Sequence, residues 1–154
     1  MAVTLVVNNI PFDYPEQGEQ APWGEAATGW AQEVTTVLNA ISGPYDILET
    51  SANIVNNQTS YAPIPGFFFD PANVRSFEVS GNIYRTDGAT DKIESFIICG
   101  LNLGSSWSFT QEGMGDAEVT FDIDPTGQVN YISSNFVGQT SGLIKFKGFA
   151  VRKT

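Results

Sequence analysis

The alternation of apolar and polar residues in the second half of the chain limits the possible folds more than any other feature. Phe77, Val79 and Ile83 alternate with polar residues, and the same pattern returns over 119–123 and 143–151. Successive side chains of a strand point to opposite faces, so this pattern predicts strands with one apolar face each. The series is typical of antiparallel β-structure.

Turn residues separate these runs. Thr86-Asp87-Gly88 has hairpin chemistry, and Asp124-Pro125-Thr126-Gly127 has the residues that a type I turn prefers. Two further stretches, 111–116 and 133–142, are predicted as loops because they are rich in glycine and small polar residues. Runs and turns together predict a mainly β fold, an antiparallel β-sandwich or jelly roll of about eight strands.

Three stretches depart from simple alternation. Ile93 to Leu103 is almost continuously apolar, which predicts an interior strand. Tyr45 to Tyr61 has no clean period and is predicted as a connector with a short strand near Ile54-Val55. Phe67-Phe68-Phe69 places aromatic rings on both faces of an extended segment, so both faces are expected to be covered there.

One helix is predicted before this β-region, from Trp23 to Ile41. Pro22 precedes it, and Gly43 followed by Pro44 ends it. Its apolar residues are three and four positions apart, which places them on one helix face. These residues are Trp23, Ala27, Trp30, Val34, Val37 and Ile41.

That helix face must be covered, and the spacing alone leaves three alternatives open. The face packs on the body of the same chain, on copies of the same helix, or on another protein. The alternation resembles a coiled-coil seam but lasts fewer than three heptads, which favours a single helix docked on a sheet.

The residues before the helix predict an extended arm. Val3 to Val7 is a short apolar run, expected to be a first strand or part of an arm, and Pro11 to Pro22 is expected to be a loop. The chain is therefore divided into residues 1–44, an arm plus helix for attachment or oligomerisation, and residues 45–154, a β-sandwich domain.

The charge distribution limits the partners. The net charge is −10, and residues 1–74 contain no Lys or Arg but eight acidic residues. Nucleic acid and membranes are not expected as partners, because binding phosphate needs clustered basic residues and no apolar run reaches membrane-spanning length. A basic protein surface would suit the acidic half.

Histidine is absent and Cys99 is the one cysteine. The commonest general base and metal ligand at neutral pH is therefore missing, and no intrachain disulfide can form. Cys99 follows Phe96-Ile97-Ile98, which predicts a buried, inert thiol.

Asp122 to Gly127 matches the first half of a calcium-binding loop. An EF-hand needs an acidic residue at position 12 of the loop, and Ser133 occupies that position here. A hairpin turn is therefore the preferred interpretation. No metal, cofactor or catalytic site is predicted.

Two carboxylate pairs, Asp116 with Glu118 and Asp122 with Asp124, have the spacing of one strand face. A hydrolase without histidine would need such a pair. A solvated polar face is the preferred interpretation of both.

Aromatic residues on β-sheets can also stack on sugars. Tyr61, Tyr84, Trp107 and Tyr131 are candidates, although core or sheet-face packing is the expected role for all four.

Two parts of the chain resemble known proteins. The helix Trp23-Gly24-Glu25-Ala26-Ala27-Thr28-Gly29-Trp30-Ala31-Gln32-Glu33-Val34-Thr35 resembles a short helix near the start of many tailed-phage virion proteins. The β-region is similar to a domain of tail-fibre-like and head-associated proteins, notably in phages of marine and cyanobacterial hosts. The similar segments are 46–52, 56–58, 74–77, 83–86, 107–108, 127–131 and 142–147.

The resemblance implies a non-enzymatic virion protein, made in the host cytoplasm and assembled in symmetric copies that are commonly trimers. It implies that the helix face is used for attachment, with the major capsid protein or another virion protein as partner. Tail-fibre relatives often carry long segments between helix and β-domain, whereas here the two are nearly adjacent. This compactness favours a capsid decoration (cement) protein or short head fibre over a tail fibre that binds a host-surface glycan.

Overall fold

The computed structural model describes residues 3–7, 10–14, 29, 31, 32, 34 and 43–153. The chain divides into two units, Met1–Pro44 and Tyr45–Thr154, and each is described by itself. Among the described residues, no helix has the length and apolar character needed to cross a membrane.

The first unit contains a β-hairpin. Strands β1 (Val3–Val7) and β2 (Ile10–Tyr14) pair antiparallel, from Val3 opposite Tyr14 to Val7 opposite Ile10. The prediction of a loop from Pro11 onward is therefore wrong over residues 11–14. A two-stranded sheet consists of edge strands, where a proline without an N–H can be accommodated.

The predicted helix is described at four positions. Gly29, Ala31, Gln32 and Val34 are helical. Of the predicted attachment face, Val34 is described and is half-buried. The other members lie outside the described residues: Trp23, Ala27, Trp30, Val37 and Ile41.

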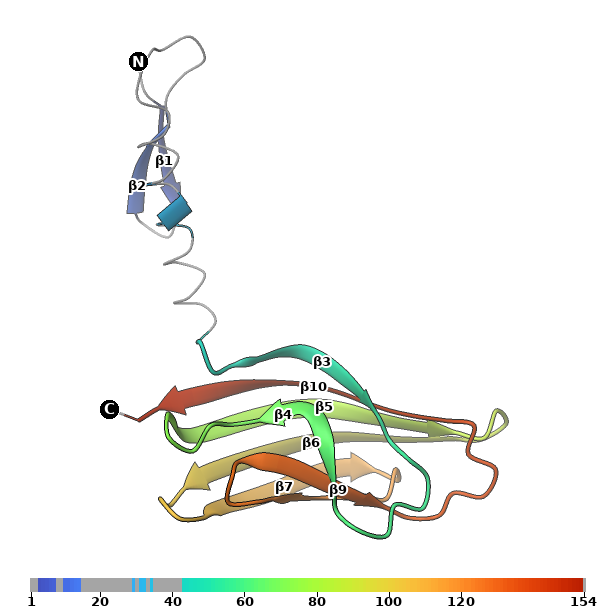
Figure 1. Cartoon of the computed structure of the whole chain (residues 1–154). Helices are drawn as coiled ribbons and strands as arrows, with labels where there is room; N and C mark the ends of the chain where they lie inside the picture. The colour runs from blue at the N-terminus through green and yellow to red at the C-terminus, as the bar shows by residue number, and fades with distance from the viewer. Residues whose placement is uncertain are drawn as a thin grey trace. The chain divides into compact units, whose positions relative to one another are not determined.

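The second unit is a β-sandwich of eight strands in two antiparallel sheets (Figure 1), which confirms the predicted fold class. The larger sheet has the order β3 (Ile47–Asn53), β10 (Ser141–Arg152), β5 (Val74–Thr86), β6 (Asp91–Asn102) and β7 (Trp107–Gly115). The smaller sheet has the order β4 (Ala62–Phe68), β9 (Gln128–Ser133) and β8 (Val119–Ile123).

Aromatic rings from both sheets form the core. The ring of Phe67 stacks on Phe146 of β10, with centroids 4.4 Å apart. Phe96 of β6 contacts Phe121 of β8, with centroids 5.0 Å apart. Such pairs stabilise beyond the area that they bury, by about 0.5–1.5 kcal/mol each.

The segment after the helix differs from its prediction. The strand in this segment is β3, which spans Ile47–Asn53. The prediction of a short strand near Ile54-Val55 is therefore wrong. The register of β3 with β10 shifts between Phe146 and Gly148. This shift breaks the period of two, which explains why alternation was not visible in the sequence.

Both faces of the extended segment Phe67–Phe69 were predicted to be covered. This prediction is wrong for the face that carries Phe68. Phe67 and Phe69 are buried, but Phe68 is 48 % exposed. Strand β4 belongs to a sheet with one face on the core, so the intervening side chain points outward.

Strand β7 continues through residues 111–115, which were predicted as a loop. It pairs with β6 from Asn102 opposite Trp107 to Glu94 opposite Gly115. The neighbouring strand supplies hydrogen-bond partners that compensate for the low strand propensity of two glycines. As predicted, β6 is an interior strand.

Candidate functional site

The candidate site is the face of the five-stranded sheet that points away from the core, here called the outer face. The register aligns its side chains in rows across β10, β5, β6 and β7. Four successive rows are Lys145–Asn82–Ser95–Met114, Lys147–Ser80–Ile97–Glu112, Phe149–Glu78–Cys99–Thr110 and Val151–Ser76–Leu101–Ser108.

Large apolar side chains are exposed on this face. The exposed fractions are 45 % for Ile97, 46 % for Leu101, 58 % for Phe149 and 60 % for Val151. These residues lie on β10 and β6, on either side of β5. Scattered apolar residues are normal on protein surfaces, but several large ones exposed on the same sheet face are typical of an interaction site.

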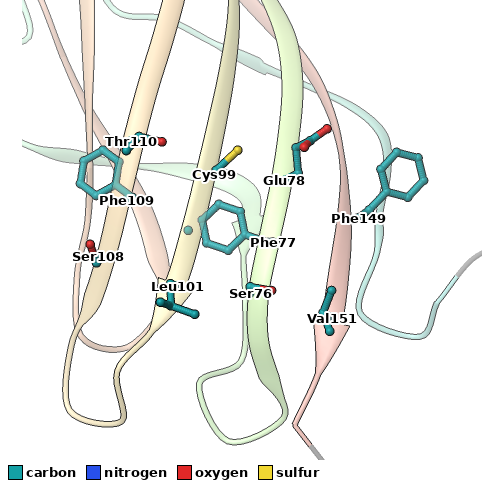
Figure 2. A pocket seen from close by; sticks show the side chains of 11 residues that line it. Ser76, Phe77, Glu78, Cys99, Leu101, Ser108, Phe109, Thr110, Phe149 and Val151 are labelled. Carbon is teal, nitrogen blue, oxygen red and sulfur yellow. The ribbon is translucent and has the colours of Figure 1, made fainter.

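A groove of about 590 Å³ is lined by Leu101, Phe149 and Val151 among other residues (Figure 2). Phe77 lies between Phe109 of β7 and Phe149 of β10 in this view. The Phe77 ring occupies the space beside Gly100, where any Cβ would clash with it. The missing side chain at residue 100 therefore leaves room for the Phe77 ring in the core beneath the groove.

Cys99 is exposed and lines this groove, so the prediction of a buried thiol is wrong. Its neighbours Phe96 and Ile98 do not share one face with it. Ile98 and Phe96 point into the core, whereas Ile97 and Cys99 point outward. An apolar run in a two-sheet sandwich buries one alternate set of its side chains and leaves the other uncovered.

The outer face carries both lysines and glutamates. Lys145 and Lys147 are on β10, and Glu112 is on β7 in the same row as Lys147. Glu78 lies between them on β5, and Glu49 of β3 lies beside the two lysines. Within the described part of the chain, no carboxylate forms an ion pair with either lysine.

A buried arginine fastens the loops at one end of the sandwich. The Arg85 guanidinium is fully buried and donates through Nη1 to the Ala117 carbonyl at 2.7 Å and through Nη2 to the Ser134 carbonyl at 2.7 Å. Nη2 also donates to Asn56 Oδ1 at 2.9 Å, and Nε donates to Gln139 Oε1 at 2.8 Å. This network joins three loops that are distant in sequence.

Glu118 lies next to this network. It forms an ion pair with Lys92 at 2.7 Å and accepts a hydrogen bond from Ser134 Oγ. These two hydrogen bonds hold the pKa of the Glu118 carboxyl below its ordinary value. Burial lowers the pKa of Arg85, and the Glu118 charge opposes this effect. The cluster is a set of satisfied structural contacts.

Three of the four paired carboxylates, Asp116, Glu118 and Asp124, have structural roles. Asp116 accepts a hydrogen bond from the Ile93 N–H, so Asp116 and Glu118 bind different groups. Asp124 accepts hydrogen bonds from Thr126, which lower the pKa of its carboxyl. The Asp124–Gly127 segment is the predicted turn between β8 and β9.

The possible calcium ligands do not converge. Ser133, at the last position of the calcium pattern, is buried and donates its hydroxyl to the Val55 carbonyl. Among the described residues, no three Asp, Glu or Cys side chains are grouped as metal ligands.

The four candidate sugar-stacking aromatics are not brought together. Tyr131 is buried and its hydroxyl accepts a hydrogen bond from the Val55 N–H, while Trp107 packs against Phe77 of the core. Tyr61 and Tyr84 are exposed at 51 % and 38 %. Of the predicted core or sheet-face packing, core packing holds for Tyr131 and Trp107, and Tyr84 lies on the outward side of β5. The prediction is wrong for Tyr61, which is exposed and precedes β4.

The residues of the outer face were not identified as a site from the sequence. The available signal was the unbroken apolar run of β6, whose odd-numbered positions include Ile93, Ile97 and Leu101. These residues are exposed because the sandwich has only two sheet layers, and the spacing of apolar residues in the sequence does not specify the number of layers.

Comparisons with known proteins give a distant similarity at the level of structure. No protein-family model matches the sequence, and no curated protein matches it. Among solved structures, the chain is similar to the Acinetobacter phage vB_ApiP_P1 tailspike protein, with a TM-score of 0.39 and 12 % identity. The alignment covers 70 % of this chain and 20 % of the tailspike chain.

Proposed function

We propose that this protein is a non-enzymatic structural component of a tailed-phage virion, a capsid decoration (cement) protein or short head fibre that assembles as a homo-oligomer. The observation that carries the proposal is the outer face, where apolar side chains such as Ile97, Leu101 and Phe149 are uncovered on one whole sheet of the sandwich. The phage assignment comes from the sequence resemblance of the helix and the β-region.

Such a protein works by burying apolar surface across the joints between subunits. Each Å² of apolar area removed from water contributes about 25 cal/mol before the cost of association. The partners are other copies of the chain and the major capsid protein or another virion protein. The acidic residues 1–74, which carry eight carboxylates and no basic side chain, suit a basic surface on that partner.

Two carboxylates that accept hydrogen bonds inside the fold support a structural role. The carboxyls of Glu118 and Asp124 have lowered pKa values because they accept hydrogen bonds inside the fold. A general acid or base at neutral pH needs the opposite shift. The proposal therefore assigns both to the maintenance of loops and turns.

The alternative is a tail-associated module that binds a host-surface glycan. Exposed Tyr61 and Tyr84 favour it, since an exposed ring can stack on a sugar. Two of the four candidate aromatics, Trp107 and Tyr131, are used inside the fold instead.

The test is the copy number on purified virions, measured by quantitative mass spectrometry against the major capsid protein. A decoration protein is expected on the order of hundreds of copies per particle, as a symmetric shell requires. A handful of copies, with antibody labelling on the tail, would support the glycan-binding alternative. Absence from the particles would overturn both.

A further inference from the structure

One row across β10, β5, β6 and β7 of the outer face carries charges of opposite sign at its two ends. In this row, Lys147 of β10 and Glu112 of β7 are separated by Ser80 and Ile97, so the two charges are at opposite sides of four adjacent strands. Lys145 adds a second positive charge on the β10 side. Within the described residues, neither lysine has an ion-pair partner.

A symmetry axis parallel to the strands converts this pattern into contacts. A twofold or threefold axis over the face brings the β10 side of one copy to the β7 side of the next. Lys147 then meets Glu112 of the next copy at the same height along the strands, and the contact repeats around the axis. The same symmetry operation places the next copy over the rows that contain Leu101, Phe149 and Val151.

The face has the size of a specific interface. Four strands about 4.8 Å apart and nine residues long span about 20 by 30 Å, or roughly 600 Å² in projection. Side chains that protrude from the sheet increase this area toward the approximately 800 Å² per partner of a standard interface. Apolar side chains on β10 and β6 and charged side chains on β10, β5 and β7 give the face both kinds of contact that such interfaces use.

We propose that the outer face binds other copies of this chain, around an axis parallel to the strands, with Lys147 of one copy paired to Glu112 of the next. This inference rests on the proposed function in taking the protein as self-assembling. It moves the contact between copies to the sheet, whereas the sequence resemblance pointed to the helix.

Charge reversal in the full-length protein tests the pairing. Light scattering over a concentration series should show a wild-type oligomer. Close interfacial charge pairs couple by more than the free energy that a tenfold change in the dissociation constant represents. Lys147→Glu or Glu112→Lys alone should therefore raise the dissociation constant at least about tenfold. The double variant should restore association. Asp122→Lys makes the same charge change as Glu112→Lys but on β8 of the other sheet. It is the matched control and should associate like the wild type.

Cys99 supplies a second measurement, because it is the one cysteine of the chain and lies on the outer face. Its reaction with a thiol reagent should be slow in the wild-type oligomer and fast in the single-reversal variants. Circular dichroism of each variant verifies that a change in association is not loss of folding.

Several outcomes would overturn the inference. An oligomer that is unaffected by either reversal, with Cys99 equally reactive in all variants, would place the contact elsewhere and leave the proposed homo-oligomer intact. A monomer with protected Cys99 would mean that the chain covers its own face. A monomer whose Cys99 is protected only on virions would assign the face to another virion protein. An outer-face oligomer that is absent from virions would instead overturn the proposed function.

Discussion

Arg85 shows how one residue can organise the end of a sandwich. A guanidinium has five N–H donors and cannot lose its charge in a protein, so burying it requires five acceptors. The three loops provide them as three side-chain oxygens, from Asn56, Ser134 and Gln139, and two carbonyls, from Ala117 and Ser134. The ring of Phe136 lies 5.7 Å from the guanidinium carbon.

Arg85→Met should therefore lower the free energy of unfolding by about 3–5 kcal/mol, because several buried oxygen acceptors lose their donor and each costs about 1–3 kcal/mol when unsatisfied. Methionine keeps much of the volume but leaves those acceptors without donors. Urea denaturation measures the effect. Arg75→Met on the exposed side of the same strand is the control and should change stability by less than about 0.5 kcal/mol. Equal effects at residues 85 and 75 would contradict a special role for the network.

The position of Arg85 was partly foreseeable. It follows Ile83 and Tyr84 in an alternating strand, so a period of two already assigns it to the inner side. Its acceptors were not foreseeable, because they come from loops 29 to 54 residues away. Sequence patterns describe local spacing, and these contacts arise only when the two sheets close.

At the scale of elements, the turn of the β8–β9 hairpin is hydrogen-bonded to the residue that follows β4. The Gly127 carbonyl accepts a hydrogen bond from the Phe69 N–H at 3.0 Å. Gly127 has a φ of +90°, and a Cβ there would clash with the Phe69 carbonyl. The turn residue is thus needed both for its backbone conformation and for close approach to the end of β4.

Gly127→Ala should destabilise the protein more than Gly104→Ala. Gly104 has a similar φ of +102° but open space around its Cβ position, so it reports the backbone cost alone. The difference between the two variants should be about 1–3 kcal/mol, which is typical of overpacking. Thermal denaturation of both proteins measures it. A smaller loss at residue 127 than at residue 104 would mean that the turn is not fixed against β4.

On the scale of the whole molecule, the core and the outer face belong to a single unit. Every residue of the buried cluster, the Arg85 network and the outer face lies within Tyr45–Thr154. That unit contains two layers around one core, which is the usual requirement for independent folding.

A chain of residues 45–154 should therefore unfold in a single cooperative transition, measured by circular dichroism in urea. It should also associate through Lys147 and Glu112, because the outer face is intact. If the fragment folds but remains monomeric while the full chain associates, then the contact between copies depends on residues 1–44. A fragment without a cooperative transition would contradict the independence of the sandwich.

The sequence by itself determined the class of the fold, the strands with clear alternation such as β8 and β10, and the turn at Asp124–Gly127. These features depend on local spacing, since side-chain period and turn chemistry act between near neighbours. Local spacing was not sufficient at β3, where a register shift concealed the period, or at residues 111–115, where pairing with β6 outweighed the glycines.

Only the tertiary structure decided which apolar residues are buried. Phe96 and Ile97 are adjacent and equally apolar, yet the first lies in the core and the second is exposed, because a sandwich of two sheets covers one face of each. The number of layers results from how all strands pack, and no single run encodes it. For this reason the outer face, with its opposed charges on β10 and β7, became apparent only when distant strands were aligned side by side.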